Sequence, residues 1–164
     1  MKERRSTVSL LNGPVPEVQG FSNDGKEADG VARWLKSMLV AGYRPRDIAI
    51  FARNDGVLRD RAEPALLKAG LTSHQLSDDQ PPSTTDASPG TMHRAKGLEL
   101  KVVVVMGCDA DLMPLKYAQK DVVDDADREL LVEQERHLVY VAATRARERL
   151  LISYSGKPSR LIPM

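Results

Sequence analysis

The chain has 164 residues, with 24 basic and 23 acidic side chains, a formal net charge of +1, and 41% hydrophobic and 29% charged residues. This length allows one domain of ordinary size, and the composition is typical of a soluble globular protein rather than a disordered or fibrous one. The balanced charge argues against nucleic-acid binding by bulk electrostatics, so any such binding requires a local groove.

The cysteine and histidine content argues against disulfide and metal sites. Cys108 is the single cysteine, which excludes an intramolecular disulfide and a cysteine-cluster zinc site, and the three histidines are scattered. The longest apolar run, 102–106, is far too short to span a bilayer, and no apolar signal core follows the N-terminus. We therefore expect a cytoplasmic protein without a resident metal and without a membrane partner.

The first half of the chain alternates predicted strands and helices. A short strand is expected over 16–21, and apolar residues spaced three and four apart predict an amphipathic helix over 26–41. Residues 48–52 are all apolar, as in a central strand covered on both faces. A second helix is expected next, with Asp55 as its N-cap and Gly70 at its end.

The second half continues the alternation. We expect a strand over 71–76, an exposed connection over 77–90 that is rich in Asp, Pro, Ser and Thr, and a buried strand over 101–105. A long helix over 125–145 and a strand over 150–154 follow. Strands alternating with helices predict a three-layer α/β domain with a mostly parallel sheet.

No self-sufficient active site is evident in the sequence. There is no G-x-x-x-x-G-K-[ST] phosphate-binding loop, no G-x-G-x-x-G and no G-x-S-x-G. Instead, a dense polar segment, 91–99, precedes the valine-rich strand. This segment is either a solvated turn or a ligand site that folds over the edge of the sheet.

Arg145 occupies an unusual position in the predicted long helix. At about 100° per residue, it lies near the apolar stripe that contains Leu138 and Val141. A permanently charged guanidinium is costly in such a place unless it has a partner. Arg145 is therefore either one half of a buried salt bridge, with Glu99 or an aspartate, or an arginine aimed at a phosphate.

Three segments resemble one family. Residues 91–99, TMHRAKGLE, resemble motif V of the superfamily 1 DNA helicases of the UvrD/Rep family, and residues 138–146, LVYVAATRA, resemble their motif VI. Residues 47–54, DIAIFARN, resemble the strand of that family that ends in a DNA contact. The similarity runs from about residue 16 to 159 and implies the C-terminal RecA-like (2A) domain of such a helicase.

The resemblance implies roles for individual residues. Arg145 would reach the γ-phosphate of ATP, and Glu99, with Gly97 beside it, would bind the nucleotide. The residues expected along a single-stranded DNA track are Arg53, Asn54, Thr91, Met92, His93 and Lys96.

The sequence departs from the family pattern at two points. The Walker motifs are missing, so an N-terminal P-loop RecA-like domain, in the same or a partner chain, would hold most of the ATP and its Mg²⁺. The large helical insert is replaced by 77–90, which puts strand separation in doubt. We expect a motor domain that is inactive alone; the alternative is a stand-alone nucleic-acid-binding or regulatory module. The domain is expected over 16–159, between an N-terminal extension, 1–15, and a tail, 160–164.

Overall fold

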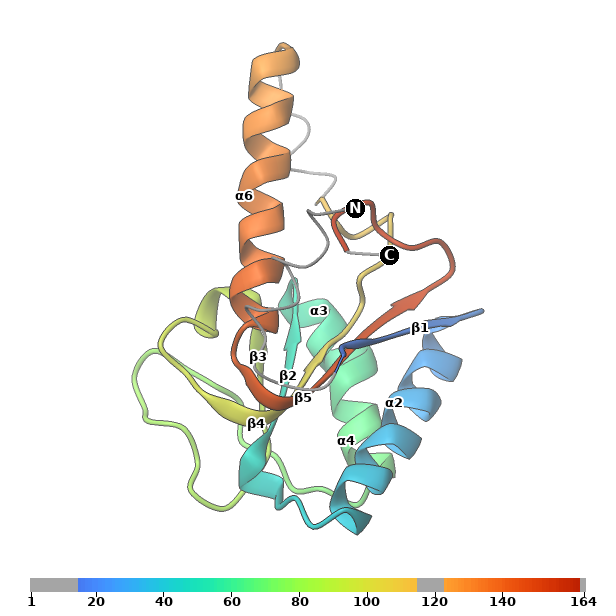
Figure 1. Cartoon of the computed structure of the whole chain (residues 1–164), viewed down its shortest axis with the longest axis vertical. Helices are drawn as coiled ribbons and strands as arrows, with labels where there is room; N and C mark the ends of the chain where they lie inside the picture. Colours follow the sequence, from blue (N-terminus) through green and yellow to red (C-terminus); the bar gives the residue numbers. More distant parts are fainter. Residues whose placement is uncertain (1–14, 115–122, 163–164) are drawn as a thin grey trace.

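A parallel β-sheet forms the centre of the molecule. The structure is a computed structural model that describes residues 15–114 and 123–162. Its five-stranded sheet has the order β1-β5-β4-β2-β3, and every neighbouring pair runs parallel (Figure 1). The strands are β1 (Glu17–Phe21), β2 (Ile48–Ala52), β3 (Ser88–Thr91), β4 (Leu100–Val105) and β5 (Ala146–Ser155).

Helices cover both faces of this sheet. Figure 1 shows α2 and α4 on one side and α6 on the other. The helices are α2 (Asp24–Val40), α3 (Asp55–Val57), α4 (Glu63–Lys68) and α6 (Asp125–Ala143). A π-helical turn, η2 (Leu58–Ala62), joins α3 to α4, and two 3-10 turns are η1 (Pro45–Asp47) and η3 (Met92–Arg94).

The central strand β2 is buried because both of its faces are covered. Successive side chains of a strand point to opposite faces. Ile48 and Ile50 pack in the core formed with α2 and α4. Ala49 and Phe51 pack in the core on the α6 side. The predicted three-layer α/β arrangement is therefore confirmed.

Two helix starts are set by asparagine side chains. Asn23 caps α2, because its side-chain oxygen accepts a hydrogen bond from the Lys26 amide at 2.9 Å. Asn54 caps α3 by accepting from the Val57 amide at 2.9 Å, with its backbone extended. The prediction that Asp55 is the N-cap was wrong by one residue, since Asp55 is the first residue inside the helix.

The region after α4 differs from its prediction. Residues 71–76 form no named strand; Ser73 makes a single bridge to Ala87. Residues 88–90, expected in an exposed connection, are buried and belong to β3, whereas 77–80 are exposed as predicted. Pro89 is tolerated there because β3 is an edge strand of the sheet, paired with β2 alone.

The C-terminal segment is part of the domain rather than a tail. Leu161 and Ile162 are each only 5% exposed and pack in the core on the α6 side. The Ser159 hydroxyl donates a hydrogen bond to the Met113 carbonyl at 2.7 Å, which holds this segment against the residues that follow β4. The expected domain end at residue 159 therefore comes at least three residues too early.

A buried ionic network ties α2 to the sheet. Glu27 Oε2 accepts from Arg61 at 2.7 Å, and Oε1 accepts from the Gly107 amide at 2.9 Å and the Ser153 hydroxyl at 2.8 Å. Arg61 also pairs with Asp109 at 2.8 Å. Burial raises the pKa of Glu27 above its ordinary value, although the Gly107, Ser153 and Arg61 hydrogen bonds oppose this shift.

The helices of the described ranges include none with the length and apolarity needed to cross a bilayer. The same ranges hold no group of three or more His, Cys, Asp or Glu side chains arranged to bind a metal ion.

Candidate functional site

A cleft at the carboxyl edge of the sheet brings together four of the predicted DNA-contacting residues. Because parallel strands end at the same edge, the residues that follow β2 meet those that end β3. The cleft has a volume of about 460 Å³. Its lining residues are Arg53, Asn54, Asp55, Asp78, Thr91, His93 and Arg94.

Two predicted DNA-contacting residues lie elsewhere. The Met92 side chain is 1% exposed and packs in the core with Phe51 and Val103, so it does not line the cleft. Its burial follows from η3, which folds back over the sheet on the α6 side. Lys96 is exposed and does not line the cleft.

Arg53 is held by a carboxylate from α6. Its Nε lies 2.8 and 3.1 Å from the two Glu135 carboxylate oxygens, and its Nη2 lies 2.6 Å from Oε1. Arg53 is 9% exposed and Glu135 3% exposed, although both residue types are usually at the surface. The pair fastens the end of β2 to the middle of α6.

The remaining cleft residues carry charges of both signs. The Nε of Arg94 lies 3.6 Å from an Asp78 carboxylate oxygen, and it is buried without a hydrogen-bond acceptor. His93 is exposed, and Thr91 is half-buried at the end of β3. The cleft therefore offers guanidinium, hydroxyl and imidazole groups, which are the usual donors to phosphate oxygens.

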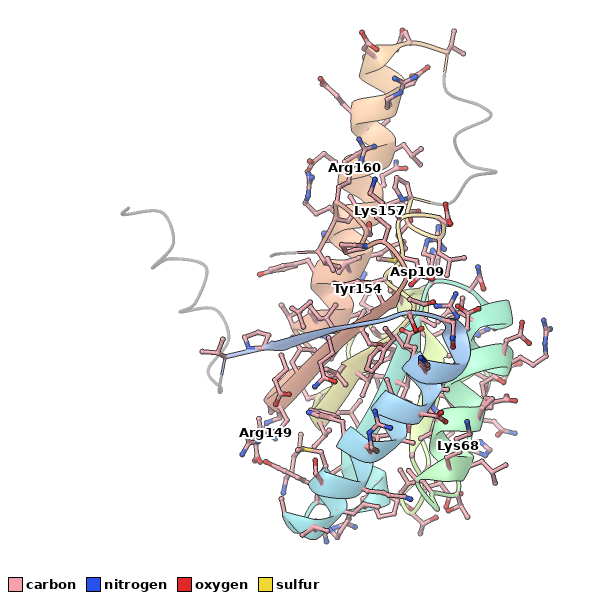
Figure 2. All side chains as sticks on the ribbon, turned by 90° about the vertical axis from the view of Figure 1, so that its right-hand side faces the viewer. Lys68, Asp109, Arg149, Tyr154, Lys157 and Arg160 are labelled. Carbon is pink, nitrogen blue, oxygen red and sulfur yellow. The ribbon has the colours of Figure 1, made fainter. Side chains whose placement is uncertain are left out.

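Arg145 lies at the opposite, amino edge of the sheet. In Figure 2, Asp109 lies at the carboxyl edge of the sheet, beyond the last residue of β4. Arg149 lies toward the amino edge, in the first half of β5. Arg145 directly precedes β5, and its carbonyl accepts a hydrogen bond from the Leu100 amide at 3.0 Å. This bond joins Arg145 to the first residue of β4.

Within the described part of the chain, the Arg145 guanidinium makes hydrogen bonds to neutral acceptors alone. Its Nε lies 3.1 Å from the Val141 carbonyl, Nη1 lies 3.4 Å from the Leu98 carbonyl, and Nη2 lies 3.3 Å from the Thr144 hydroxyl. Among the ion pairs of residues 15–114 and 123–162, none involves Arg145. The described residues therefore show no salt bridge between Arg145 and Glu99 or an aspartate.

The predicted helical position of Arg145 was also wrong. The helix α6 ends at Ala143, Thr144 is its C-cap, and Ala146 already belongs to β5. Where the backbone leaves the helix, the Arg145 carbonyl accepts a hydrogen bond from the Leu100 amide of the sheet. Arg145 is thus half-buried at a helix-to-strand junction rather than on an apolar helical stripe.

The other predicted nucleotide-binding residues lie close to Arg145 along the chain fold. The Leu98 carbonyl that accepts from Arg145 stands between Gly97 and Glu99 in the sequence. Gly97 has a φ of +81°, the left-handed region that favours glycine, and apart from its chain neighbours no described residue has an atom within 4 Å of the place where a Cβ would stand. Glu99 is exposed. The structure thus places Gly97, Glu99 and Arg145 around one junction.

The sequence reasoning missed Glu135, as well as Asp55, Asp78 and Arg94 in the lining of the cleft. Glu135 lies four and seven residues before Val139 and Ala142, which are the other buried residues of α6. A carboxylate at the helical spacing of a buried stripe needs a cationic partner. The spacing of Glu135 from Val139 and Ala142 is therefore the sequence feature that could have identified it as a buried, paired residue.

Helicases are among the known proteins that this chain resembles in sequence. A subunit of the ATP-dependent helicase/deoxyribonuclease of Pelotomaculum thermopropionicum is 28% identical over 176 aligned residues, which cover 94% of this chain and 15% of that protein. The "ATP-dependent DNA helicase PcrA" of Staphylococcus aureus is 39% identical over 79 residues, covering 44% of this chain and 10% of that protein. The chain thus spans 15% or less of the length of these curated relatives.

The fold and the family agree with these similarities. The crystal structure of the C-terminal domain of a possible DNA helicase from Lactobacillus plantarum WCFS1 matches with a TM-score of 0.64 and 21% identity, over 91% of this chain and 79% of that one. This likeness confirms the expected RecA-like fold. The family model "UvrD-like helicase C-terminal domain" matches residues 65–157, more than half of the chain and including both the cleft residues after β3 and Arg145. The chain therefore belongs to the family of UvrD-like helicase C-terminal domains.

Proposed function

We propose that this chain is the C-terminal motor domain of an ATP-dependent DNA helicase or translocase. In this role it supplies an arginine to the ATP site and part of a track for single-stranded DNA. Its family supports this proposal, and the sequence has no phosphate-binding loop of its own. An N-terminal P-loop domain, in the same or a partner chain, would therefore hold the nucleotide, and this chain would be inactive alone.

The observation that carries the proposal is the uncompensated charge of Arg145. Its guanidinium is always ionised, is half-buried, and among the described residues it contacts two carbonyls and a hydroxyl. An anion supplied from outside the domain would complete its surroundings. ATP with Mg²⁺, held mainly by the P-loop domain, would supply the transferring γ-phosphoryl group. Arg145 would then stabilise the negative charge that develops on that group during transfer.

The neighbours of Arg145 suit a nucleotide. The Glu99 carboxylate is exposed and would accept a hydrogen bond from the sugar. Gly97 has open space on the side where another residue would carry its Cβ, so the backbone can approach a ligand closely. The described residues offer no acidic cluster for Mg²⁺, so its ligands would come from the other domain and the phosphates.

The cleft at the carboxyl edge suits the backbone of single-stranded DNA. Arg53, Thr91 and His93 offer donors to phosphate oxygens without reading base edges. Asn54 lines the same cleft, although its side-chain oxygen is used as a helix cap. Lys96 is exposed farther along the same segment and would add a further cationic contact.

Two packed segments join the cleft to Arg145. Residues 92–99 lead from the end of β3 to the start of β4, and thus from one edge of the parallel sheet to the other. The helix α6 carries Glu135, bound to Arg53, and ends two residues before Arg145. A shift at either edge would therefore be transmitted through contiguous packed elements.

The activity part of the proposal is tested with the purified 164-residue chain. It should bind ATP weakly and show no steady-state hydrolysis with Mg²⁺, because it lacks the phosphate cradle and the metal ligands. If the wild-type chain alone hydrolyses ATP and Arg145→Ala abolishes this activity, the two-domain proposal is overturned. The exposed Arg147→Ala is the matched control for loss of a positive charge nearby.

The DNA part is tested by titrating labelled oligonucleotides across a salt series. We expect weak binding that favours single strands. The logarithm of the binding constant should fall with the logarithm of the salt concentration with a slope of roughly −2, because two to four phosphate contacts each contribute about −0.7 for single strands. Tight, salt-insensitive binding or a clear preference for duplex would contradict this part. If the chain binds DNA as expected but Arg145→Ala leaves ATP hydrolysis by the intact protein unchanged, the result would instead favour a stand-alone nucleic-acid-binding module.

A further inference from the structure

Arg53 presents only part of its guanidinium to the cleft. Its Nε and Nη2 are bound to the Glu135 carboxylate. Its Nη1 makes no hydrogen bond within the described residues, and it is not one of the buried atoms left without a partner, so it retains contact with solvent. The pair therefore orients one free edge of Arg53 toward the cleft.

The chemistry of that free edge fits a phosphate. An arginine whose inner edge is fixed by a carboxylate still carries three N–H donors, two on Nη1 and one on Nη2, and its orientation is determined before a ligand arrives. The Thr91 hydroxyl and the His93 imidazole line the same cleft. Each of these groups can donate a hydrogen bond to a phosphate oxygen, and the Asp55 and Asp78 carboxylates line the cleft as well.

Glu135 is therefore more than a structural counterion. We infer that Glu135 is a positioning residue that holds Arg53 so that its free edge binds a phosphate group in the carboxyl-edge cleft. This inference rests on the proposed function, because that function supplies two sources of phosphate, the DNA backbone and the nucleotide. Glu135 itself is buried behind Arg53 and does not touch the ligand.

Positioning and simple charge screening predict opposite results. If Glu135 only screens Arg53, Glu135→Gln leaves a more positive cleft and tightens phosphate binding. If it positions Arg53, the neutral amide holds the guanidinium less well and binding weakens. We expect the dissociation constant to rise roughly tenfold, the low end of the loss that follows removal of a supporting hydrogen-bond partner around a bound ion.

The test is an NMR titration of arginine side-chain N–H resonances in the full 164-residue chain. Arg53→Lys identifies the Arg53 signals. Single-stranded oligothymidylate and ATP with Mg²⁺ are added in separate titrations. A response to the oligonucleotide alone assigns the phosphate to DNA, and a response to ATP alone assigns it to the nucleotide. The matched control is Glu129→Gln, the same change at an exposed position of α6.

We expect Arg53 to respond in the wild type and in Glu129→Gln, and to need about tenfold more ligand in Glu135→Gln. If Glu135→Gln fails to fold, Glu135→Asp keeps the charge and shortens the side chain, and it should also weaken binding. Binding as tight as the wild type in the folded variant would overturn the inference. If signals from Thr91 and His93 respond while those of Arg53 do not, the inference is overturned and the proposed function stands. If no signal responds, the result counts against the proposed function as well.

Discussion

Replacement of Arg145 by alanine should cost the isolated chain little stability. The side chain makes three contacts of 3.1, 3.4 and 3.3 Å, all to neutral acceptors that lie at a partly exposed junction. A hydrogen bond contributes about 0.5–1.5 kcal/mol net, and the two longer contacts fall at the lower end. The free energy of unfolding should therefore decrease by about 1.5–2.5 kcal/mol.

The same substitution at Arg53 provides the internal comparison. Arg53→Ala leaves the Glu135 carboxylate buried without its partner, which should cost about 3–5 kcal/mol. Urea denaturation followed by the fluorescence of Trp34, the single and buried tryptophan, measures both variants. Arg147→Ala, at an exposed position, should stay within about 0.5 kcal/mol of the wild type. A loss in Arg145→Ala as large as that in Arg53→Ala would show that Arg145 is a structural residue and refute its assignment to a ligand.

Two further predictions concern the fold. Burial raises the pKa of Glu27 above its ordinary value of 4.5, so its contribution to stability is fully present below that value and is lost as pH rises through the folded-state pKa. Relative to Glu27→Gln, the wild type should thus lose free energy of unfolding as the pH is raised from 4, which urea denaturation at a series of pH values measures. A difference between the two proteins that is constant with pH would contradict the raised pKa. Leu161→Ala should lose about 2–5 kcal/mol, because Leu161 is a core residue. Thermal and urea unfolding should show no such loss for the exposed neighbour variant Arg160→Ala, and equal behaviour of the two variants would mean that the C-terminal segment is not part of the core.

The central elements of the fold were predictable from local patterns. Residues 48–52 are apolar at every position, which only a strand covered on both faces can use, and the structure has β2 at these residues. The valine run became β4 for the same reason. In α2 the apolar residues are spaced three and four positions apart, which is likewise a local property. This helix could therefore be predicted without knowledge of the elements packed against it.

Elements that depend on distant neighbours were not predictable in this way. The β3 sequence, Ser-Pro-Gly-Thr, has no strand pattern, and its burial is decided by Leu76, which packs so closely that a Cβ on Gly90 would lie 2.8 Å from it. The end of α6 is followed directly by the hydrogen bond from the Leu100 amide to the Arg145 carbonyl, a contact between residues far apart in the sequence. Neither contact has a periodic signature in the sequence.

The candidate site was predicted in part for the same reason. The likeness of whole segments to helicase motifs identified Arg53, Thr91 and His93, and the structure places them in one cleft. The carboxylate that holds Arg53 is 82 residues away in the sequence, so no local pattern joins the two. Met92 was assigned to the DNA track through the resemblance of 91–99 to motif V, but the structure places its side chain in the core.

The most direct measurement is single-turnover ATP hydrolysis by the intact protein that contains both this domain and its P-loop domain. With Arg145→Ala, hydrolysis should slow by roughly a thousandfold or more, as on loss of an arginine that stabilises a transferring phosphoryl group. Binding of single-stranded DNA should remain nearly unchanged, and Arg147→Ala should hydrolyse ATP at the wild-type rate. Hydrolysis by Arg145→Ala at the wild-type rate would contradict the proposed role of this domain in the ATP site.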